Sequence, residues 1–163
     1  MRLSSGWTWR DNMTINRAQV EQILVRRCGA YMAAAGLDSE LYDGTNKDLN
    51  DPIGYAVRMC DGTVSDYTTI ANADLLTVAS TDYDKLLDIA ELRLLDSIAS
   101  NLDDVDLVVG QRSEKLNQLA LNLQAIMERK ANRVEKSYGI GAPIVGTGAI
   151  VLDFADHNEA LPT

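Results

Sequence analysis

The chain has 163 residues, of which 46% are hydrophobic and only 6% are aromatic, which suits one domain with a core of Leu, Ile, Val and Ala. Its 24 acidic and 15 basic residues give a net charge of −9, so sequence-independent binding to a nucleic-acid backbone is disfavoured for want of cations. No stretch approaches about eighteen consecutive apolar residues, and the first residues lack an apolar run of about seven. We therefore expect neither a membrane span nor a secretory signal, and synthesis in a reducing cytoplasm.

Residues 1–13 predict an extended N-terminal arm. Trp7 and Trp9 are separated by one position, which places both rings on the same side of an extended segment. Two interpretations stay open. The rings either cover the end of the protein's own bundle or anchor the arm on a neighbouring subunit, because Trp is enriched at the centres of interfaces.

The first helix is predicted to begin near Thr14 or Asn16, both good N-caps, and to continue to Ala35 before Gly36 ends it. Residues 37–50 are rich in Asp, Asn, Gly and Ser, which predicts a surface loop of the length often used for contacts. The acids of this loop do not match the spacing of a helix-loop-helix calcium site, so no metal is expected there.

A second, short helix is predicted from Asp51 and Pro52 to Asp61, with Asp51 as the cap and Pro52 in the first helical position. After it, Asn72 is expected to cap a brief turn that continues to Val78.

The third helix is predicted to start at a variant of the capping box, Thr81 with Asp84. Its apolar face is formed by Tyr83, Leu86, Leu87, Ala90, Leu94, Leu95 and Ile98, with Glu91 and Arg93 off that face. Residues 102–112 then predict a solvated turn in which Asp103, Asp104 and Asp106 stand close together without completing a metal site; the β-branched part, 105–109, is also suited to a short strand.

The last helix is predicted from Ser113, an N-cap, to Tyr138, with Gly139 as a left-handed cap and Ile140 making the accompanying contact. Apolar residues recur along one face at Leu116, Leu119, Ala120, Leu123, Ile126, Met127, Ala131 and Val134. Because its length nearly matches that of the third helix, the two are expected to pack antiparallel as the core of an all-α bundle over residues 14–141. The cations Lys115, Arg129, Lys130, Arg133 and Lys136 either complement the helix dipole or form a binding patch.

Residues 142–163 predict an extended C-terminal tail. Pro143 and several glycines break any helix, and 149–154 is a short apolar run of strand type. The sequence Gly146-Thr147-Gly148 lacks the Gly and Lys of a phosphate-binding loop. The tail either adds to a sheet edge of a partner or folds back on its own bundle.

No catalytic constellation is present in the sequence. His157, the single histidine, has no Ser or Cys in an evident activating arrangement, and Cys28 and Cys60 resemble small buried hydrophobic residues rather than a disulfide or metal pair. We therefore expect no enzyme activity, no catalytic or cofactor-binding residues, no cofactor and no metal.

Three segments carry a family resemblance: DPIGYAVRMCDG at 51–62, the stretch 82–116 and RVEKSYGIG at 133–141. Together with the order of the predicted elements over residues 14–141, they make the chain similar to the head-to-tail connector (adaptor) proteins of tailed bacteriophages. The resemblance implies a structural virion protein that forms a ring beneath the portal, in the neck between capsid and tail, with the portal's twelve-fold symmetry.

The resemblance also implies partners. The tail would contact the portal through residues Ile144, Val145, Ile150, Val151, Leu152 and Phe154, and a loop would meet a further neck or tail protein. DNA would pass through the lumen without specific binding, since like charges prevent phosphate contacts; acids such as those at 103, 104 and 106 would line it. The alternative is a small cytoplasmic helical regulatory or scaffolding protein that binds one partner through its tail.

Overall fold

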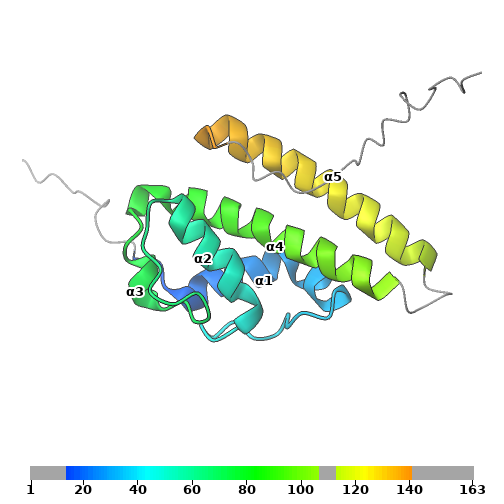
Figure 1. Ribbon diagram of the computed structural model, residues 1–163, viewed down its shortest axis with the longest axis horizontal. Helices are drawn as coiled ribbons and strands as arrows, with labels where there is room; N and C mark the ends of the chain where they lie inside the picture. Colours follow the sequence, from blue (N-terminus) through cyan, green and yellow to red (C-terminus); the bar gives the residue numbers. More distant parts are fainter. Residues whose placement is uncertain (1–13, 107–112, 141–163) are drawn as a thin grey trace, which may run out of the picture.

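The computed structural model describes residues 14–106 and 113–140, with side chains at 14–102 and 118–140 (Figure 1). These residues are helical and contain no strand, so the predicted all-α class is confirmed. The predicted arm 1–13 and tail 142–163 lie outside the described residues. None of the helices in the described ranges is long and apolar enough to cross a bilayer. The elements are α1 (Arg17–Ala34), η1 (Lys47–Leu49), α2 (Asn50–Met59), α3 (Asn72–Leu75), η2 (Ser80–Asp82), α4 (Tyr83–Asp106) and α5 (Ser113–Tyr138).

Helix α4 lies at the centre of the molecule and packs against α1, α2 and α5 (Figure 1). We predicted that the α4–α5 pair would form the core. The core is instead formed mainly by α4 with α1 and α2. Most buried apolar residues belong to α1, α2 and α4, whereas α5 adds Leu123, Met127 and Val134. The reason is that α4 is apolar on more than one side, which allows it to pack between two layers. Its buried apolar residues are Leu86, Leu87, Ile89, Ala90, Leu92, Leu94, Leu95, Ile98 and Leu102.

Helices α4 and α5 run antiparallel, as predicted. The end of α5 meets the start of α4, where the Tyr138 hydroxyl donates to Asp88 at 3.0 Å. The predicted bounds of α5 are confirmed, and Gly139 adopts the expected left-handed conformation with φ +64° while its N–H donates to the carbonyl of Glu135. Ile140 packs against the core, which completes the predicted cap.

Two helix starts differ from the prediction. Helix α2 begins at Asn50 directly from the 3-10 turn η1, so its N-cap position, Leu49, is already helical in φ and ψ and makes no side-chain cap bond. Asp51 is therefore inside the helix and its carboxylate pairs with Arg93 instead. Helix α4 likewise starts at Tyr83 from the 3-10 turn η2, in place of the capping box expected at Thr81. In both cases a preceding turn supplies the helical geometry that local capping rules assign to one side chain.

Asn72 caps a different helix from the one predicted. Its side-chain oxygen accepts a hydrogen bond of 2.7 Å from the backbone N–H of Arg17, at the start of α1. At α3 it is Asp74 that accepts from the N–H of Ala71. The free backbone N–H groups at the start of α1 have a second acceptor, because Asn16 and Gln19 also form a reciprocal capping box.

Residues 103–106 are the last turn of α4, whereas the sequence predicted a solvated turn from residue 102 onward. Leu102 is buried and continues the apolar spacing of Ile98, which explains why the helix persists through the acidic stretch.

Candidate interaction surface

The residues predicted to bind partners lie outside the described part of the chain. Trp7 and Trp9 belong to the arm, and Ile144, Val145, Ile150, Val151, Leu152 and Phe154 belong to the tail, so the predictions about them stay predictions. The candidate surface is therefore built from residues that the structure describes.

Four side chains lie in contact with one another and are here called the Arg–Tyr patch: Tyr55 and Arg93, which are half-buried, and Arg58 and Tyr67, which are exposed. The guanidinium carbon of Arg58 lies 4.9 Å from the ring centre of Tyr67 and 5.9 Å from that of Tyr55. On the other side, the guanidinium carbon of Arg93 lies 5.3 Å from the ring centre of Tyr55. These separations fall in the range of cation–π attraction. Tyr67 is 56% exposed.

The two arginines of the Arg–Tyr patch differ in their charge partners. Arg93 donates to Asp51 at 2.8 Å and to Asp96 at 3.3 Å, and the hydrogen bond to Asp51 raises the pKa of Arg93. Arg58 is exposed, and none of the described residues forms a hydrogen bond or ion pair with it. The patch therefore presents one uncompensated guanidinium between two aromatic rings. Arg, Tyr and Trp are the residue types enriched at the energetic centres of protein interfaces.

The position of Tyr67 is fixed by its own loop. Asp66 accepts hydrogen bonds from the backbone N–H and the hydroxyl of Thr68, and Asn50 donates to the carbonyl of Thr68 at 2.6 Å. Nearby, the Ser65 hydroxyl donates to Asp74, which is buried. The loop that carries Tyr67 is thus tied to both α2 and α3, and it holds the ring beside Arg58.

A buried ion pair between Arg17 and Glu21 joins the loops around the start of α1. Arg17 is 4% exposed; it pairs with Glu21 at 2.7 Å and donates to Asn50 at 2.6 Å and to the carbonyl of Asn46 at 2.7 Å. Glu21 is fully buried and accepts from the backbone N–H groups of Gly44 and Asn46. The predicted surface loop 37–50 is therefore anchored to α1 by this ion pair. Two of its residues, Asn46 and Leu49, are buried and cannot contact a partner.

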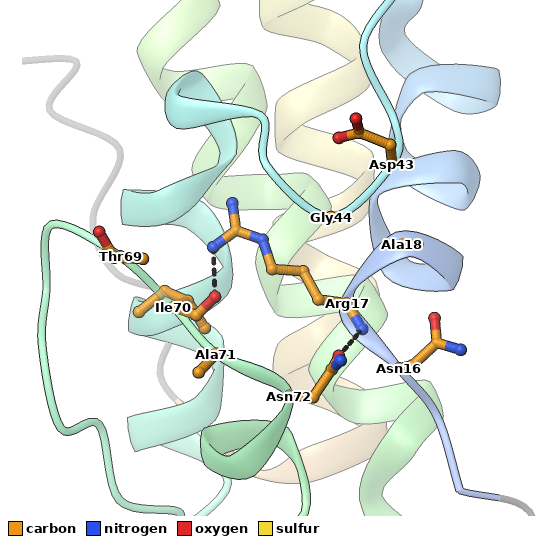
Figure 2. Close-up of a pocket in the computed structure, with 9 residues that line it drawn as sticks. All are labelled: Asn16, Arg17, Ala18, Asp43, Gly44, Thr69, Ile70, Ala71 and Asn72. Atoms are coloured by element: carbon orange, nitrogen blue, oxygen red, sulfur yellow. Dashed lines mark hydrogen bonds between the residues drawn. The ribbon is translucent and has the colours of Figure 1, made fainter.

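An open hollow of about 460 Å³ lies above this ion pair, between α1 and the two loops. Figure 2 shows the Arg17 side chain running beneath it toward the carbonyl of Ile70, while Asn72 reaches the Arg17 backbone. Asp43 at the rim accepts from the Thr45 hydroxyl, a hydrogen bond that lowers the pKa of Asp43. The charged groups of the hollow are thus engaged in internal hydrogen bonds. The complete lining is Asn16, Arg17, Ala18, Asp43, Gly44, Thr69, Ile70, Ala71 and Asn72.

A second buried acid lies where α1, α4 and α5 meet. Glu91 is 3% exposed and pairs with Arg27 at 2.9 Å and with Lys130 at 2.6 Å. The sequence placed Glu91 off the apolar face of α4; it is nevertheless buried, and cations from two neighbouring helices compensate its charge. Asp88 also lies in this cluster and accepts a hydrogen bond from the Tyr138 hydroxyl.

Both cysteines are free and buried, as predicted. Burial raises the pKa of Cys28 to about 12, with a further contribution from the nearby Glu91, and burial raises that of Cys60 to about 11. Within the described ranges, no three His, Cys, Asp or Glu side chains gather as they would around a metal ion.

Comparison with protein-family models, curated proteins and solved structures finds no significant match. The Arg–Tyr patch was missed by the sequence analysis. Tyr55 and Arg58 stand three positions apart on one helix, a visible signal, but Tyr67 and Arg93 join them only through tertiary packing.

Proposed function

We propose that the protein is a structural subunit, a head-to-tail connector (adaptor) that assembles as a ring beneath the portal of a tailed bacteriophage and joins capsid to tail. The observation that supports this proposal best is the presence of two different exposed surfaces on different sides of α4. A ring needs such a pair, because each subunit contacts one neighbour with one surface and the other neighbour with another.

The first surface is the Arg–Tyr patch, which is formed by α2, the loop after it and α4. The second is the outer side of α5, which packs chiefly on α4 and leaves the opposite side exposed (Figure 1). Leu121 on this side is 61% exposed, and Ala125, Arg129 and Asn132 accompany it. The two surfaces differ in chemistry, as a head-to-tail contact requires.

In this proposal the ring is twelve-fold and lies in the virion neck. The tail residues Ile144, Val145, Ile150, Val151, Leu152 and Phe154 contact the portal, and the arm with Trp7 and Trp9 anchors on a neighbouring subunit. A further neck or tail protein binds below. DNA passes through the lumen without specific binding, which agrees with the net charge of −9.

The mass of the full-length protein in solution tests this function. We expect light scattering to show a ring when a portal protein from the same genome is added, and deletion of residues 142–163 to abolish that assembly. A stable monomer or dimer whose mass does not change when the portal is added would contradict the proposal. It would favour a regulatory or scaffolding protein that binds its partner through the tail.

Two exposed leucines provide a matched pair of variants for the ring contact. Leu121 on α5 and Leu76 after α3 are exposed to almost the same extent, 61% and 59%. We expect Leu121→Gln to weaken assembly with the portal and Leu76→Gln to leave it unchanged. Equal effects of both substitutions would show that the outer side of α5 is not a lateral contact.

A further inference from the structure

The unpaired guanidinium of Arg58 defines the kind of ligand that the Arg–Tyr patch fits. A guanidinium offers a planar fork of N–H donors that matches a carboxylate, and stacking on aromatic rings orients the fork before a ligand arrives. The exposed ring of Tyr67 beside it offers apolar area. The complementary ligand is therefore a peptide segment with carboxylates close to an aromatic side chain.

The chain itself contains one such segment near its C-terminus. Residues 141–163 include the acids Asp153, Asp156 and Glu159 and contain no Lys or Arg. Phe154, the only phenylalanine of the sequence, stands next to the first of these acids. The negative charge and the aromatic side chain of this segment thus complement the Arg–Tyr patch.

The start of this segment lies within reach of the patch. The end of α5 is fixed beside the start of α4 by the bond from Tyr138 to Asp88. Arg93 follows Asp88 by five positions on the same helix, a rise of about 7.5 Å. Between Ile140 and Asp153 the chain has about 13 residue steps, which span up to about 45 Å when extended. This length exceeds the roughly 39 Å of α5, the longest helix in the described residues.

We propose that the Arg–Tyr patch binds residues 153–159 of the same molecule, with a carboxylate of this segment paired with Arg58 and Phe154 against Tyr67. Attachment to the same chain favours this contact, because a short linker holds the segment at a high effective concentration. The segment docks on the patch when no portal is bound. This inference rests on the proposed connector function for its role: the portal would compete for the same tail, so docking would regulate portal binding.

Nuclear magnetic resonance of the full chain tests whether the patch and the segment meet. The substitutions Asp153→Asn, Asp156→Asn and Glu159→Gln together remove the three charges. We expect the Arg58 side-chain N–H signal and the Tyr67 ring signals to shift. The matched control removes three other charges, through Asp103→Asn, Asp104→Asn and Asp106→Asn, and leaves these signals unchanged. If the Arg58 and Tyr67 signals do not shift in the first triple variant, the proposal is overturned.

Carbodiimide crosslinking then identifies the contact and tells whether it is intramolecular. Arg58→Lys keeps the positive charge and introduces an amine, which condenses with an activated carboxylate to an amide while the carbodiimide takes up the water as a urea. Mass spectrometry should find this amide to residue 153, 156 or 159. The control is Arg26→Lys, since Arg26 is also exposed, on α1. We expect a yield from position 58 about fivefold above that from position 26, in line with an ion pair on the surface.

Mixed samples of unlabelled and ¹⁵N-labelled chains separate the possible outcomes. Crosslinked peptides that combine only equal labels support docking within one molecule. Peptides that combine both labels would overturn the intramolecular contact in favour of one between copies, and equal yields from positions 26 and 58 would overturn the patch as the binding site. No portal is present in any arm, so failure here is distinct from failure of the connector function.

Discussion

Lys130 on α5 and Glu91 on α4 form an ion pair in which the two partners differ sharply in burial. The ammonium nitrogen lies 2.6 Å from the carboxylate oxygen; the Glu91 side chain is 4% exposed and the Lys130 side chain is 31% exposed. Arg27 of α1, which is 43% exposed, supplies the second cation. The acid therefore depends on its partners, whereas each cation has access to water.

This asymmetry predicts unequal effects of removing the partners. Replacing both cations, Arg27→Ala with Lys130→Ala, leaves a buried carboxylate unpaired and should lower the free energy of unfolding by about 3–5 kcal/mol. Glu91→Gln frees two cations that can turn to solvent, so we expect a smaller loss of about 1–2 kcal/mol. Urea unfolding followed by circular dichroism measures both. Lys136→Ala, an exposed residue of α5, is the control and should change the value by less than about 0.5 kcal/mol. Equal losses for the acid and for the two cations would contradict the argument.

Arg17 should be the most sensitive charged residue of the loop side. Arg17→Met removes the partner of the fully buried Glu21 and several hydrogen bonds at once, so the free energy of unfolding should fall by about 3–5 kcal/mol. Arg26→Met, an exposed change on the same helix, should cost less than about 0.5 kcal/mol. Denaturant titration of the two variants checks this. A mild effect of Arg17→Met would mean that Glu21 finds water or another donor.

Tyr138 predicts a stability change at high pH. Burial, then the hydrogen bond to Asp88, raises the pKa of Tyr138 to about 12, above its ordinary value near 10. The folded state thus holds the phenolic proton more tightly than the unfolded state. The resulting stability is present below about pH 10 and is lost as the pH rises toward about 12.

The comparison with Tyr138→Phe isolates this effect from other groups that titrate in the same range. Wild type should be the more stable protein at pH 8, by about 1 kcal/mol for the hydrogen bond, and the difference should shrink as the pH approaches 12. Unfolding by urea at several pH values measures it. A difference that stays constant over this range would show that the Tyr138 hydroxyl is not held by Asp88.

Two glycines should respond differently to an added methyl group. At Gly62 a Cβ atom would lie 2.7 Å from Cγ1 of Val57 and 2.9 Å from its carbonyl oxygen, and backbone cannot move aside cheaply. Gly62→Ala should therefore cost about 1–3 kcal/mol.

At Gly54 the close atom is Cδ1 of Ile70, at 2.8 Å, the far end of a flexible side chain. Gly54→Ala also gains about 1 kcal/mol of helix propensity in α2, so the net change should be near zero. Thermal unfolding of both variants ranks them. A larger loss at Gly54 than at Gly62 would contradict the predicted order.

Helix α5 could be predicted from the sequence because every signal for it is local. Ser113 and Gly139 mark its ends, and the apolar spacing between them identifies the buried side that Leu123, Met127 and Val134 confirm. The all-α class and the antiparallel α4–α5 pair follow from the same kind of evidence.

The starts of α2 and α4 and the end of α4 were local errors, whereas the others concern relations between distant parts of the chain. Asn72 caps α1 at Arg17, 55 residues earlier, so no rule limited to one helix end could assign it. Glu91 is buried because its cations come from α1 and α5, which a helical wheel of α4 alone cannot show. The Arg–Tyr patch is a similar case, since Tyr67 and Arg93 meet α2 only in the folded protein.

Because α5 packs chiefly on α4 alone, it can detach from the protein by local unfolding. Helix α5 packs chiefly on α4, and its described side chains, 118–138, contribute three residues to the buried core, whereas α1, α2 and α4 contribute most of the others. Detachment of α5 therefore exposes less apolar surface than complete unfolding and costs less free energy. In native-state hydrogen exchange, the amides of α5 should exchange as one group, before those of α4. The subunit can thus release its last helix while the rest of its fold stays intact.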